Sequence, residues 1–430
     1  MLGHRNFFHP VGQGLFYSGQ IVSPDCNPFN YIYDCGSEDA RLTQSMVMSY
    51  ICNYIGAVEP IDLLVLSHFH QDHFNGFPTL FKEIGNRIGS GRKPVQDIVI
   101  PYLSDIERIM IVLDYLDNIV PSELDLESDE WRLLISPEEY LRKICNRLIR
   151  ISAPESANPT PDASPKGDGP KERGRSDADK RERWETVETK NRFTTKGTTH
   201  SSVGDGDDEE IVDWTIDSSY CPLKHSSNLM WWEFRFYRKI ADLKKQQAFE
   251  AAYKRLGSPS PEDLIKDKNL LKKLRKACKT TFNSNDAVND TSVAMHSALH
   301  YSGRSVPQLS RQMQAYTGFP YSSPFSYLPV GTGSDTWHQM AGGEKRGYLL
   351  TGDLDLADSA SWSALKLAFD IADPGRAKEL LILQVPHHGA KGNFSTTHFS
   401  LHPAPTYIFS AGIGNRHGHP SWDLINELKS

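Results

Sequence analysis

The feature that most restricts the fold of this chain is the stretch 63–76, LLVLSHFHQDHFNG, in which an apolar run leads directly into potential metal ligands. Its first four residues are apolar, as in a strand that is buried on both faces. Three histidines and one aspartate then follow within six positions, namely His68, His70, Asp72 and His73. Imidazole and carboxylate together suit Zn²⁺, Mn²⁺ or Fe, and the lack of cysteine in this stretch argues against a closed structural zinc site. A strand that ends in such a loop directs His68 and His70 toward one point, and Asp72 and His73 toward a second point nearby.

Strand-like and helix-like segments alternate around this stretch, and their alternation predicts an α/β fold. In the first third of the chain the strand-like segments are 14–23, 29–37, 61–68 and 97–103. The helix-like segments of the same region are 40–57 and 74–89. Further strand-like runs that bring polar residues to or near one end occur at 289–296, 347–355, 378–389 and 405–415.

The composition divides the chain into four parts. Residues 1–151 and 289–430 are expected to form the two halves of one domain. Between them, 152–213 is rich in Pro, Gly, Ser and charges of both signs, and we expect it to be a disordered insertion because it has almost nothing to bury. The part 214–288 combines a strand-like segment with Lys-rich helices at 241–279, for which two interpretations stay open: a solvated amphipathic face or a surface that docks a partner protein.

Charge and cysteine content limit the function classes. The formal net charge is -7, so the whole molecule has no general attraction for nucleic acid, and a phosphate-bearing substrate must be held by local groups or metal. The six cysteines are widely scattered without a CxxC pair, which favours reduced thiols. No basic leader followed by an apolar run and no stretch of ~20 apolar residues occurs, so we expect a cytoplasmic protein with no membrane partner.

The motif His-x-His-x-Asp-His after a hydrophobic strand resembles the signature of the metallo-β-lactamase fold superfamily. Six further blocks resemble, in the same order, the branch that contains the hydrolase domain of ComEC-type competence proteins. These blocks are FHPVGQGLFYSG, YIYDCGS, NDTSVAM, LLTGDL, VPHHGAKGNFS and SAGIGNRHGHPS. The resemblance covers most of the chain outside the insertion, and it implies a four-layer αββα sandwich with the ligands at one edge of two mixed sheets.

The resemblance also implies ligand roles for the residues of the motif. His68 and His70 would belong to one metal site, and Asp72 and His73 to the other. Asp353, in LLTGDL, matches the carboxylate that bridges both metals. The implied cofactors are therefore two divalent metal ions, Zn or Mn.

Residues of the other blocks receive roles from the resemblance as well. One of His387 and His388 would complete the second metal site, and the sequence does not distinguish between them. Asp34 matches a carboxylate that fixes a ligand histidine through its ring N–H. His419 would reach the substrate or leaving group as a catalytic residue with Asp72 and Asp353, or else support a turn beside the following proline.

Four more polar residues are ambiguous. Lys391 and Asn415 are candidate substrate-binding residues, although a lysine is often simply solvated and an asparagine often shapes a turn. Asn289 and Ser292 match the Asn-x-x-Ser block of the branch, where a role as hydrogen bonders at a strand end is an equal alternative.

The chain departs from the superfamily pattern in two respects. No histidine stands in a diagnostic context between the motif and Asp353 to complete the first metal site; His225, His296 and His300 are the available ones. Leu15 stands where the branch commonly has an acidic residue. Occupancy of both metal sites is thus less strongly implied than the fold.

Two metal ions about 3.5–4 Å apart can hold a hydroxide between them and offset the charge of a phosphodiester. The expected function is therefore that of a phosphodiesterase or nuclease, with a nucleic acid or another phosphodiester as substrate. The resemblance extends to soluble bacterial defence proteins, in which such a domain would act as an effector. Alternatives are a hydrolase of a carbon ester, lactone or cyclic nucleotide, and a scaffold that keeps the fold without catalysis.

Overall fold

The computed structural model describes 15 segments of the chain. These are residues 3–23, 26–53, 59–119, 124–153, 185–190, 210–214, 218–223, 230–239, 242–282, 286–301, 336–338, 347–370, 380–397, 406–412 and 414–429. Within them the protein is α/β with two mixed sheets, which confirms the fold class expected from the alternation of segments. No helix in these ranges has the length and apolar character needed to cross a bilayer.

The first sheet has eight strands in the order β12-β1-β2-β3-β4-β5-β6-β8. Their bounds are Gly3–Phe8 (β1), Phe16–Ser23 (β2), Cys26–Cys35 (β3), Ile61–Val65 (β4), Val95–Pro101 (β5), Cys145–Ile151 (β6), Glu210–Trp214 (β8) and Thr336–His338 (β12). From β3 to β8 the pairing is parallel, and Tyr33 on β3 lies opposite Val65 on β4. This register places Asp34 beside the start of the histidine motif.

The second sheet has seven strands in the order β15-β14-β13-β11-β10-β9-β7. Their bounds are Glu185–Lys190 (β7), Ser218–Leu223 (β9), Met230–Arg238 (β10), Val293–Tyr301 (β11), Gly347–Leu350 (β13), Leu380–Gln384 (β14) and Thr406–Ile408 (β15). Because β13, β14 and β15 are parallel, their carboxyl ends meet at one edge, where the loops with Asp353 and His387 begin.

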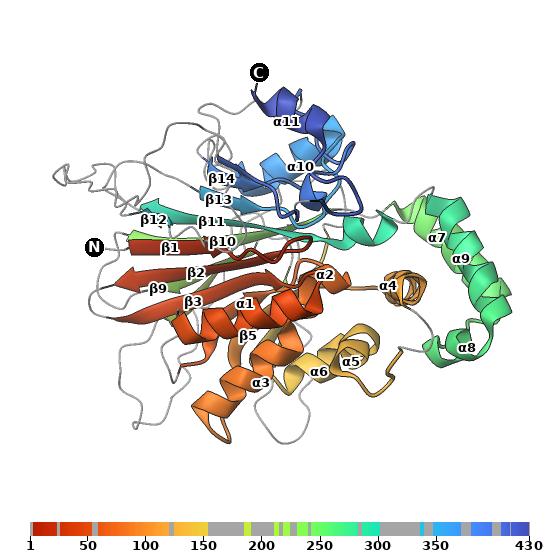
Figure 1. Cartoon of the computed structure of the whole chain (residues 1–430), viewed down its shortest axis with the longest axis horizontal. Coiled ribbons are helices and arrows are strands. Elements are labelled where there is room, and N and C mark those ends of the chain that lie inside the picture. The colour runs from red at the N-terminus through yellow and green to blue at the C-terminus, as the bar shows by residue number, and fades with distance from the viewer. Residues whose placement is uncertain are drawn as a thin grey trace.

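The helices lie outside the sheets and at one side of them (Figure 1). Figure 1 shows α1 and α3 against the first sheet, α10 and α11 beside the second, and α7 to α9 projecting beyond α4. The bounds are Ala40–Asn53 (α1), Gln71–Phe74 (α2), Phe77–Ile88 (α3), Asp105–Asn118 (α4), Asp129–Ile135 (α5), Pro137–Arg142 (α6), Leu243–Arg255 (α7), Pro261–Lys266 (α8), Lys268–Phe282 (α9), Ser359–Asp370 (α10) and Trp422–Lys429 (α11), with 3-10 turns at Asp286–Thr291 (η2) and His387–Gly389 (η4).

Three buried clusters hold these elements together. One cluster combines both sheets, with Tyr31 and Val65 of the first and Phe234 and Met295 of the second, so the sheets pack face to face. Burial of each such large side chain contributes roughly 1.5–3 kcal/mol. A second cluster joins the first sheet to α1, α3 and α4, and the third joins the second sheet to α10 and α11. The carboxyl ends of the central strands are thereby held on a rigid base.

The predicted segments agree with these elements in part. The Lys-rich helices predicted at 241–279 correspond to α7, α8 and α9, and Ser260 and Asp263 form a capping box at the start of α8. The helix-like segment 40–57 gives α1, which ends at Asn53. Within the insertion predicted at 152–213, strand β7 and most of β8 are formed, and most other residues of that range lie outside the described ones.

Candidate metal centre

The site is built around Asp34, which lies near the end of β3 and directly follows the last β3 residue that pairs with β4. Its backbone has a φ of 55°, and one carboxylate oxygen accepts a hydrogen bond from the Ser67 amide at 2.6 Å. The other oxygen accepts from the Ser67 hydroxyl at 2.6 Å and lies 2.8 Å from Nδ1 of His73. Asp34 therefore ties the end of β4 to helix α2, on which Asp72 and His73 stand.

The orientation of three ligand candidates follows from the oxygen atoms behind them. The Ser67 hydroxyl gives its proton to Asp34, so it accepts from Nδ1 of His68 at 3.0 Å. His73 donates from Nδ1 to Asp34, and His388 donates from Nδ1 to the Ser410 carbonyl at 2.8 Å. In each ring Nε2 is left to face the centre, which is the arrangement found for histidines that bind metal.

His70 is turned the other way round. Its Nδ1 lies 2.9 Å from Nε2 of His68, while its own Nε2 faces the Asp114 carboxylate of α4 at 3.4 Å. Two imidazole lone pairs repel each other at this distance unless a proton or a cation lies between them. Asp114 was not among the residues expected from the sequence, because nothing local connects a carboxylate on α4 with the histidine motif.

The two oxygens of Asp353 face different histidines. Oδ1 lies 3.3 Å from Nε2 of His73 and 3.8 Å from Nε2 of His388. Oδ2 lies 3.7 Å from Nε2 of His68 and 3.9 Å from Nε2 of His387. The buried Asp353 side chain thus stands between two sets of nitrogen atoms.

Asp72 joins the second of these sets. Its Oδ2 lies 3.1 Å from Nε2 of His388 and 4.0 Å from Nε2 of His73. Two groups of potential ligand atoms result, each within 4.8 Å: His68, His73 and Asp353, and then Asp72, His73 and His388. His73 belongs to both, whereas the sequence had assigned it to one site only.

The charges of the cluster are strongly coupled. Burial alone would raise the pKa of Asp353, but His388, His73 and His387 hold it well below its usual value. Burial alone would lower the pKa of His73, but Asp353, Asp72 and Asp34 raise it well above its usual value. The pKa of His68 is lowered well below its usual value by burial and by His73 and His70. The carboxylates thus require positive charge among them, while His68 stays neutral and able to ligate.

The residues fit a metal ion, because buried ligand atoms are left without partners. Within the described residues, Nε2 of His73, Nε2 of His388 and Oδ1 of Asp353 make no hydrogen bond of normal geometry although all are buried. Such atoms are costly unless something binds them. Atoms bound to one Zn²⁺ at 2.0–2.1 Å lie about 3.3 Å apart, which is close to the spacing in this cluster.

The two adjacent histidines of η4, His387 and His388, have different surroundings. Both have left-handed backbone conformations, with φ values of 48° for His387 and 55° for His388, so their side chains diverge. His388 is buried and reaches Asp72, whereas His387 is part-exposed and has Asn289 Nδ2 at 3.3 Å from its Nδ1. The geometry favours His388 as the residue that completes the group with Asp72.

The remaining candidates lie at the rim of the cluster or away from it. The ring of His419 is 5.7 Å from that of His387, and Gln13 Nε2 lies 3.4 Å from its Nδ1. Burial, together with His387 and His388, lowers the pKa of His419 to about 4, so the ring is neutral at pH 7. Ser292 is buried, and its hydroxyl accepts a 3.3 Å hydrogen bond from the Asp353 amide.

Two predicted substrate contacts have other partners. Asn415 binds the carbonyls of Gly412 and His419 and accepts from the amides of His417 and His419, so it organises the turn before the helix α11. Lys391 is exposed and pairs with Asp423 at 2.8 Å. The structure therefore gives both residues local structural roles and does not bring them into the cluster.

The alternatives for a further histidine ligand are also resolved in part. His296 packs against Phe369 of α10, with ring centroids 5.4 Å apart, and so faces away from the cluster. His225 lies outside the described residues, as does the side chain of His300. Leu15 is buried, and it contributes through its backbone: its amide donates to the Asp72 carbonyl at 3.2 Å, and its carbonyl accepts from Gly36 at 3.0 Å.

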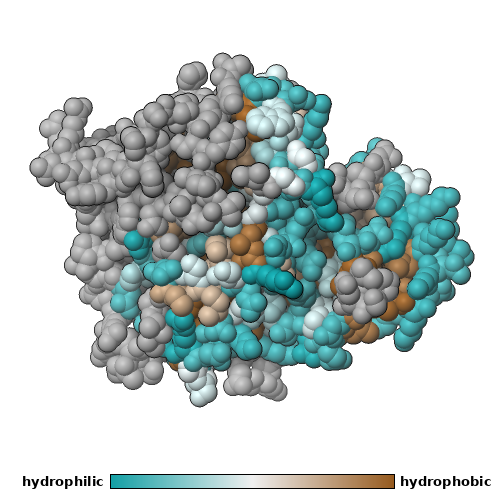
Figure 2. Space-filling model, in the orientation of Figure 1, coloured by the Kyte–Doolittle hydropathy of each residue, from teal (hydrophilic) through white to brown (hydrophobic). Residues whose placement is uncertain are grey.

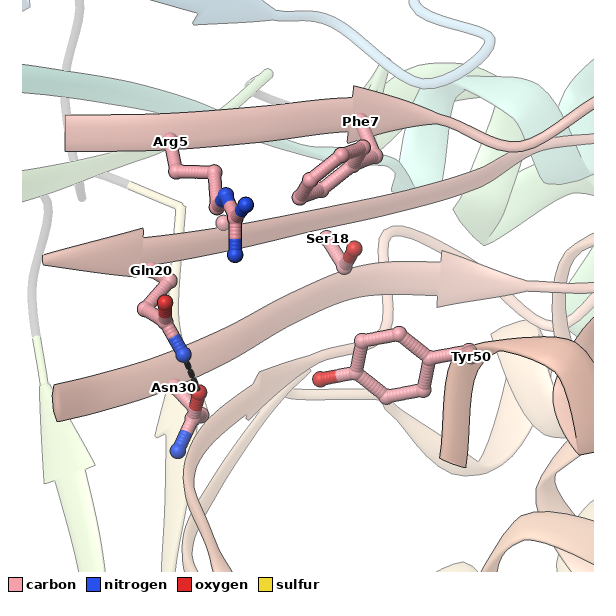
Figure 3. Close-up of a pocket in the computed structure, with 7 residues that line it drawn as sticks. Arg5, Phe7, Ser18, Gln20, Asn30 and Tyr50 are labelled. Atoms are coloured by element: carbon pink, nitrogen blue, oxygen red, sulfur yellow. Dashed lines mark hydrogen bonds between the residues drawn. The ribbon is translucent and has the colours of Figure 1, made fainter. Parts of the chain in front are cut away.

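A separate small pocket lies against β1, β2, β3 and α1 (Figure 3). Its lining includes Arg5, Phe7, Ser18 and Tyr50, and a hydrogen bond between Gln20 and Asn30 closes one side. None of its described lining residues carries an imidazole, a thiol or a carboxylate. The histidine cluster, rather than this pocket, is therefore the candidate functional site.

Comparison with models of protein families, with curated proteins and with solved structures finds no match for the chain. The interpretation of the cluster consequently rests on its own geometry.

Asp34→Asn is expected to weaken metal binding by about 10–100-fold, the usual effect of removing an outer partner of a ligand histidine. Asparagine keeps the shape of Asp34 but removes the charge that holds the Nδ1 proton of His73. Titration of metal-free protein with Mn²⁺ or Zn²⁺ in a calorimeter measures the change. Asp39→Asn, at the start of α1, is the matched control and should bind metal as the wild type does.

Proposed function

We propose that the chain is a metal-dependent hydrolase of the metallo-β-lactamase type that cleaves phosphodiesters. The observation that supports this most directly is the orientation of His68, His73 and His388. Nδ1 of each ring is hydrogen-bonded to an oxygen atom, and each Nε2 faces Asp353 or Asp72. We also propose that the two face-to-face sheets and their outer helices form the αββα sandwich of that superfamily.

Asp353 and Asp72 would hold the metal ions with the four histidines at 68, 70, 73 and 388. Bound divalent ions would supply an activated water at neutral pH and offset negative charge on the substrate. Asp353 has one oxygen toward each set of histidines, so it would keep the two ions close together. Asp34 and Ser67 would hold the rings in place and prevent their rotation.

His419 has the properties of a hydrogen-bond donor at the rim of the site. If the Gln13 amide donates to Nδ1, the proton of the neutral ring is on Nε2. A neutral Nε2–H donor can bind a phosphate oxygen or the departing oxygen without a protonation step. We assign this function to His419 because His387 and His388, whose rings lie within 6.3 Å of it, connect it to the cluster.

A phosphodiester is favoured over a carbon ester because the cluster combines two carboxylates with at least four histidines. Such a site concentrates the positive charge that an anionic substrate needs, whereas an uncharged ester gains less from a second ion. A carbon ester or lactone remains the alternative that the same centre would also attack, and a cyclic nucleotide is an alternative substrate within the phosphodiesters.

The test is hydrolysis by metal-loaded protein of bis(p-nitrophenyl) phosphate, of short DNA and RNA oligonucleotides, and of a lactone and a thioester. We expect cleavage of phosphodiesters that a chelator abolishes and Mn²⁺ or Zn²⁺ restores. The double variant Asp72→Ala/His73→Ala should lose this activity while keeping its circular dichroism spectrum. Efficient lactone or thioester hydrolysis with every phosphodiester left intact would reject the proposal in favour of the carbon-ester alternative.

A further inference from the structure

Helix α9 has a charge opposite to that of the chain as a whole. All of its charged residues are basic, although the chain carries a net charge of -7. These residues are Lys268, Lys272, Lys273, Arg275, Lys276 and Lys279. A helix without a single compensating carboxylate gains nothing from internal ion pairs, so its charges are available to a partner.

The basic residues of α9 divide into an anchoring pair and an open face. Arg275 Nε lies 2.8 Å from Asp117 Oδ1, and Lys279 Nζ lies 3.5 Å from Asp117 Oδ2. Leu274 of α9 is buried in the cluster that includes α4. The other four lysines are exposed and make no ion pair with any part of the chain that the structure describes. We call Lys268, Lys272, Lys273 and Lys276 the basic face.

Helix α4 connects this face to the candidate metal centre. Asp114 of α4 faces His70 at 3.4 Å, and Asp117 of the same helix receives Arg275 and Lys279. Side chains three positions apart on a helix lie about 5–6 Å from each other at Cβ. One end of α9 is thus anchored about one helical turn from the group that contacts His70. Figure 1 shows α9 beyond α4, on the side of α4 that is away from the sheets.

The dimensions of α9 suit an extended polyanion. Its 15 residues span about 22 Å at 1.5 Å per residue, the length of roughly six phosphates at 3.4 Å per nucleotide of one strand. Two further exposed lysines, Lys244 of α7 and Lys266 of α8, lie on the same helical unit.

The surface favours nucleic acid over a protein partner. Protein interfaces have an apolar centre, but the exposed large apolar residues of the described chain include none on α9 and, on α7, only its first residue, Leu243. In Figure 2 the outer edge of the α7 to α9 unit is hydrophilic, whereas apolar residues show on the part of it nearer to α4. A face of lysines without apolar anchors is the form that phosphate-backbone binding takes.

We propose that the basic face of α9 binds the phosphate backbone of a nucleic acid strand and holds it beside the metal centre. This rests on the proposed function, because it names nucleic acid as the phosphodiester that the centre cleaves. The net charge of -7 gives the whole molecule no general attraction for nucleic acid, but a local basic helix can still bind its phosphates.

The test compares a quadruple variant, Lys268→Gln/Lys272→Gln/Lys273→Gln/Lys276→Gln, with a matched control, Arg41→Gln/Lys82→Gln/Arg132→Gln/Lys143→Gln. The control removes four exposed basic residues, three on α1, α3 and α5 and one directly after the end of α6. Fluorescence anisotropy of a labelled 20-nucleotide single strand, at several salt concentrations and with metal-free protein, measures binding. Hydrolysis of bis(p-nitrophenyl) phosphate by the metal-loaded proteins is measured in parallel.

The quadruple variant should bind the strand at least about tenfold more weakly at low salt, with a salt slope lower by up to about 3, because each lost phosphate contact removes about 0.7. Its hydrolysis of bis(p-nitrophenyl) phosphate should equal that of the control. Binding and salt slope equal to the control would overturn the proposal. Equal displacement of the strand by polyglutamate of matched charge would also overturn it, because the face would then recognise any polyanion, acidic protein included.

The two proposals fail separately in this design. Strand binding is measured without metal or turnover, so a protein that binds through α9 but hydrolyses no phosphodiester contradicts only the proposed function. If the protein hydrolyses bis(p-nitrophenyl) phosphate but the quadruple variant binds the nucleic acid as the control does, only the proposed role of α9 is contradicted.

Discussion

Asp353→Asn should abolish high-affinity metal binding in both halves of the cluster and lower phosphodiester hydrolysis by at least ~10³-fold. The carboxylate of Asp353 is the one group with an oxygen near His68 and the other near His73 and His388, among the described residues. Asparagine preserves volume but offers one weak oxygen ligand in place of two charged ones. Metal content by mass spectrometry and activity with bis(p-nitrophenyl) phosphate measure the two effects.

Asp355→Asn is the matched control for this variant. Asp355 lies two residues further along the same loop and is half-exposed, with Lys239 at 4.0 Å. The control should keep both metal content and activity. Metal should also stabilise the wild type and the control against unfolding, by about 2.7 kcal/mol at 100 times the dissociation constant, and leave Asp353→Asn unchanged. Two bound ions per chain in Asp353→Asn would contradict the bridging role.

The α/β class was predictable because local patterns determine it. Buried strands such as β4 and β14 consist of continuous apolar runs, and amphipathic segments between them become helices. Strand β7 was not predictable from its own residues, ETVETK, which have no apolar alternation. It pairs with β9 at the edge of the second sheet, and such pairing depends on residues distant in the sequence.

The candidate site was predictable to the extent that its potential ligands are clustered in the sequence. The four residues at 68–73 share one strand end, and parallel pairing brings Asp34 to it. The choice between His387 and His388 depends on two consecutive left-handed residues, which a pair of identical letters cannot reveal. Asp114 comes from α4 and meets His70 only through tertiary packing. At position 15, where the resembled branch commonly has an acidic residue, the backbone of Leu15 instead forms hydrogen bonds with Asp72 and Gly36.

Gly36→Ala is expected to have the second large effect, because the backbone of the ligand segment lies directly against Gly36. A β-carbon at this position would lie 2.5 Å from the Asp72 carbonyl carbon and 2.6 Å from the His73 nitrogen. Both contacts are with backbone, so no side chain can rotate away to relieve them. The peptide between Asp72 and His73 must move, although His73 is held by Asp34 and the Asp72 carbonyl by the Leu15 amide.

We expect Gly36→Ala to destabilise the fold by about 1–3 kcal/mol, the usual range for overpacking, and to weaken metal binding at least ~10-fold because two ligands move together. Gly85→Ala is the matched control: Gly85 lies within α3, and a β-carbon there would meet only Cγ of Pro94, at 3.7 Å. In a helix this change should stabilise by up to about 1 kcal/mol. Urea unfolding of the metal-free proteins, followed by Mn²⁺ titration, separates the two effects. A Gly36→Ala protein that unfolds at the wild-type midpoint and binds metal with wild-type affinity would show that the ligand segment is not fixed by this backbone contact.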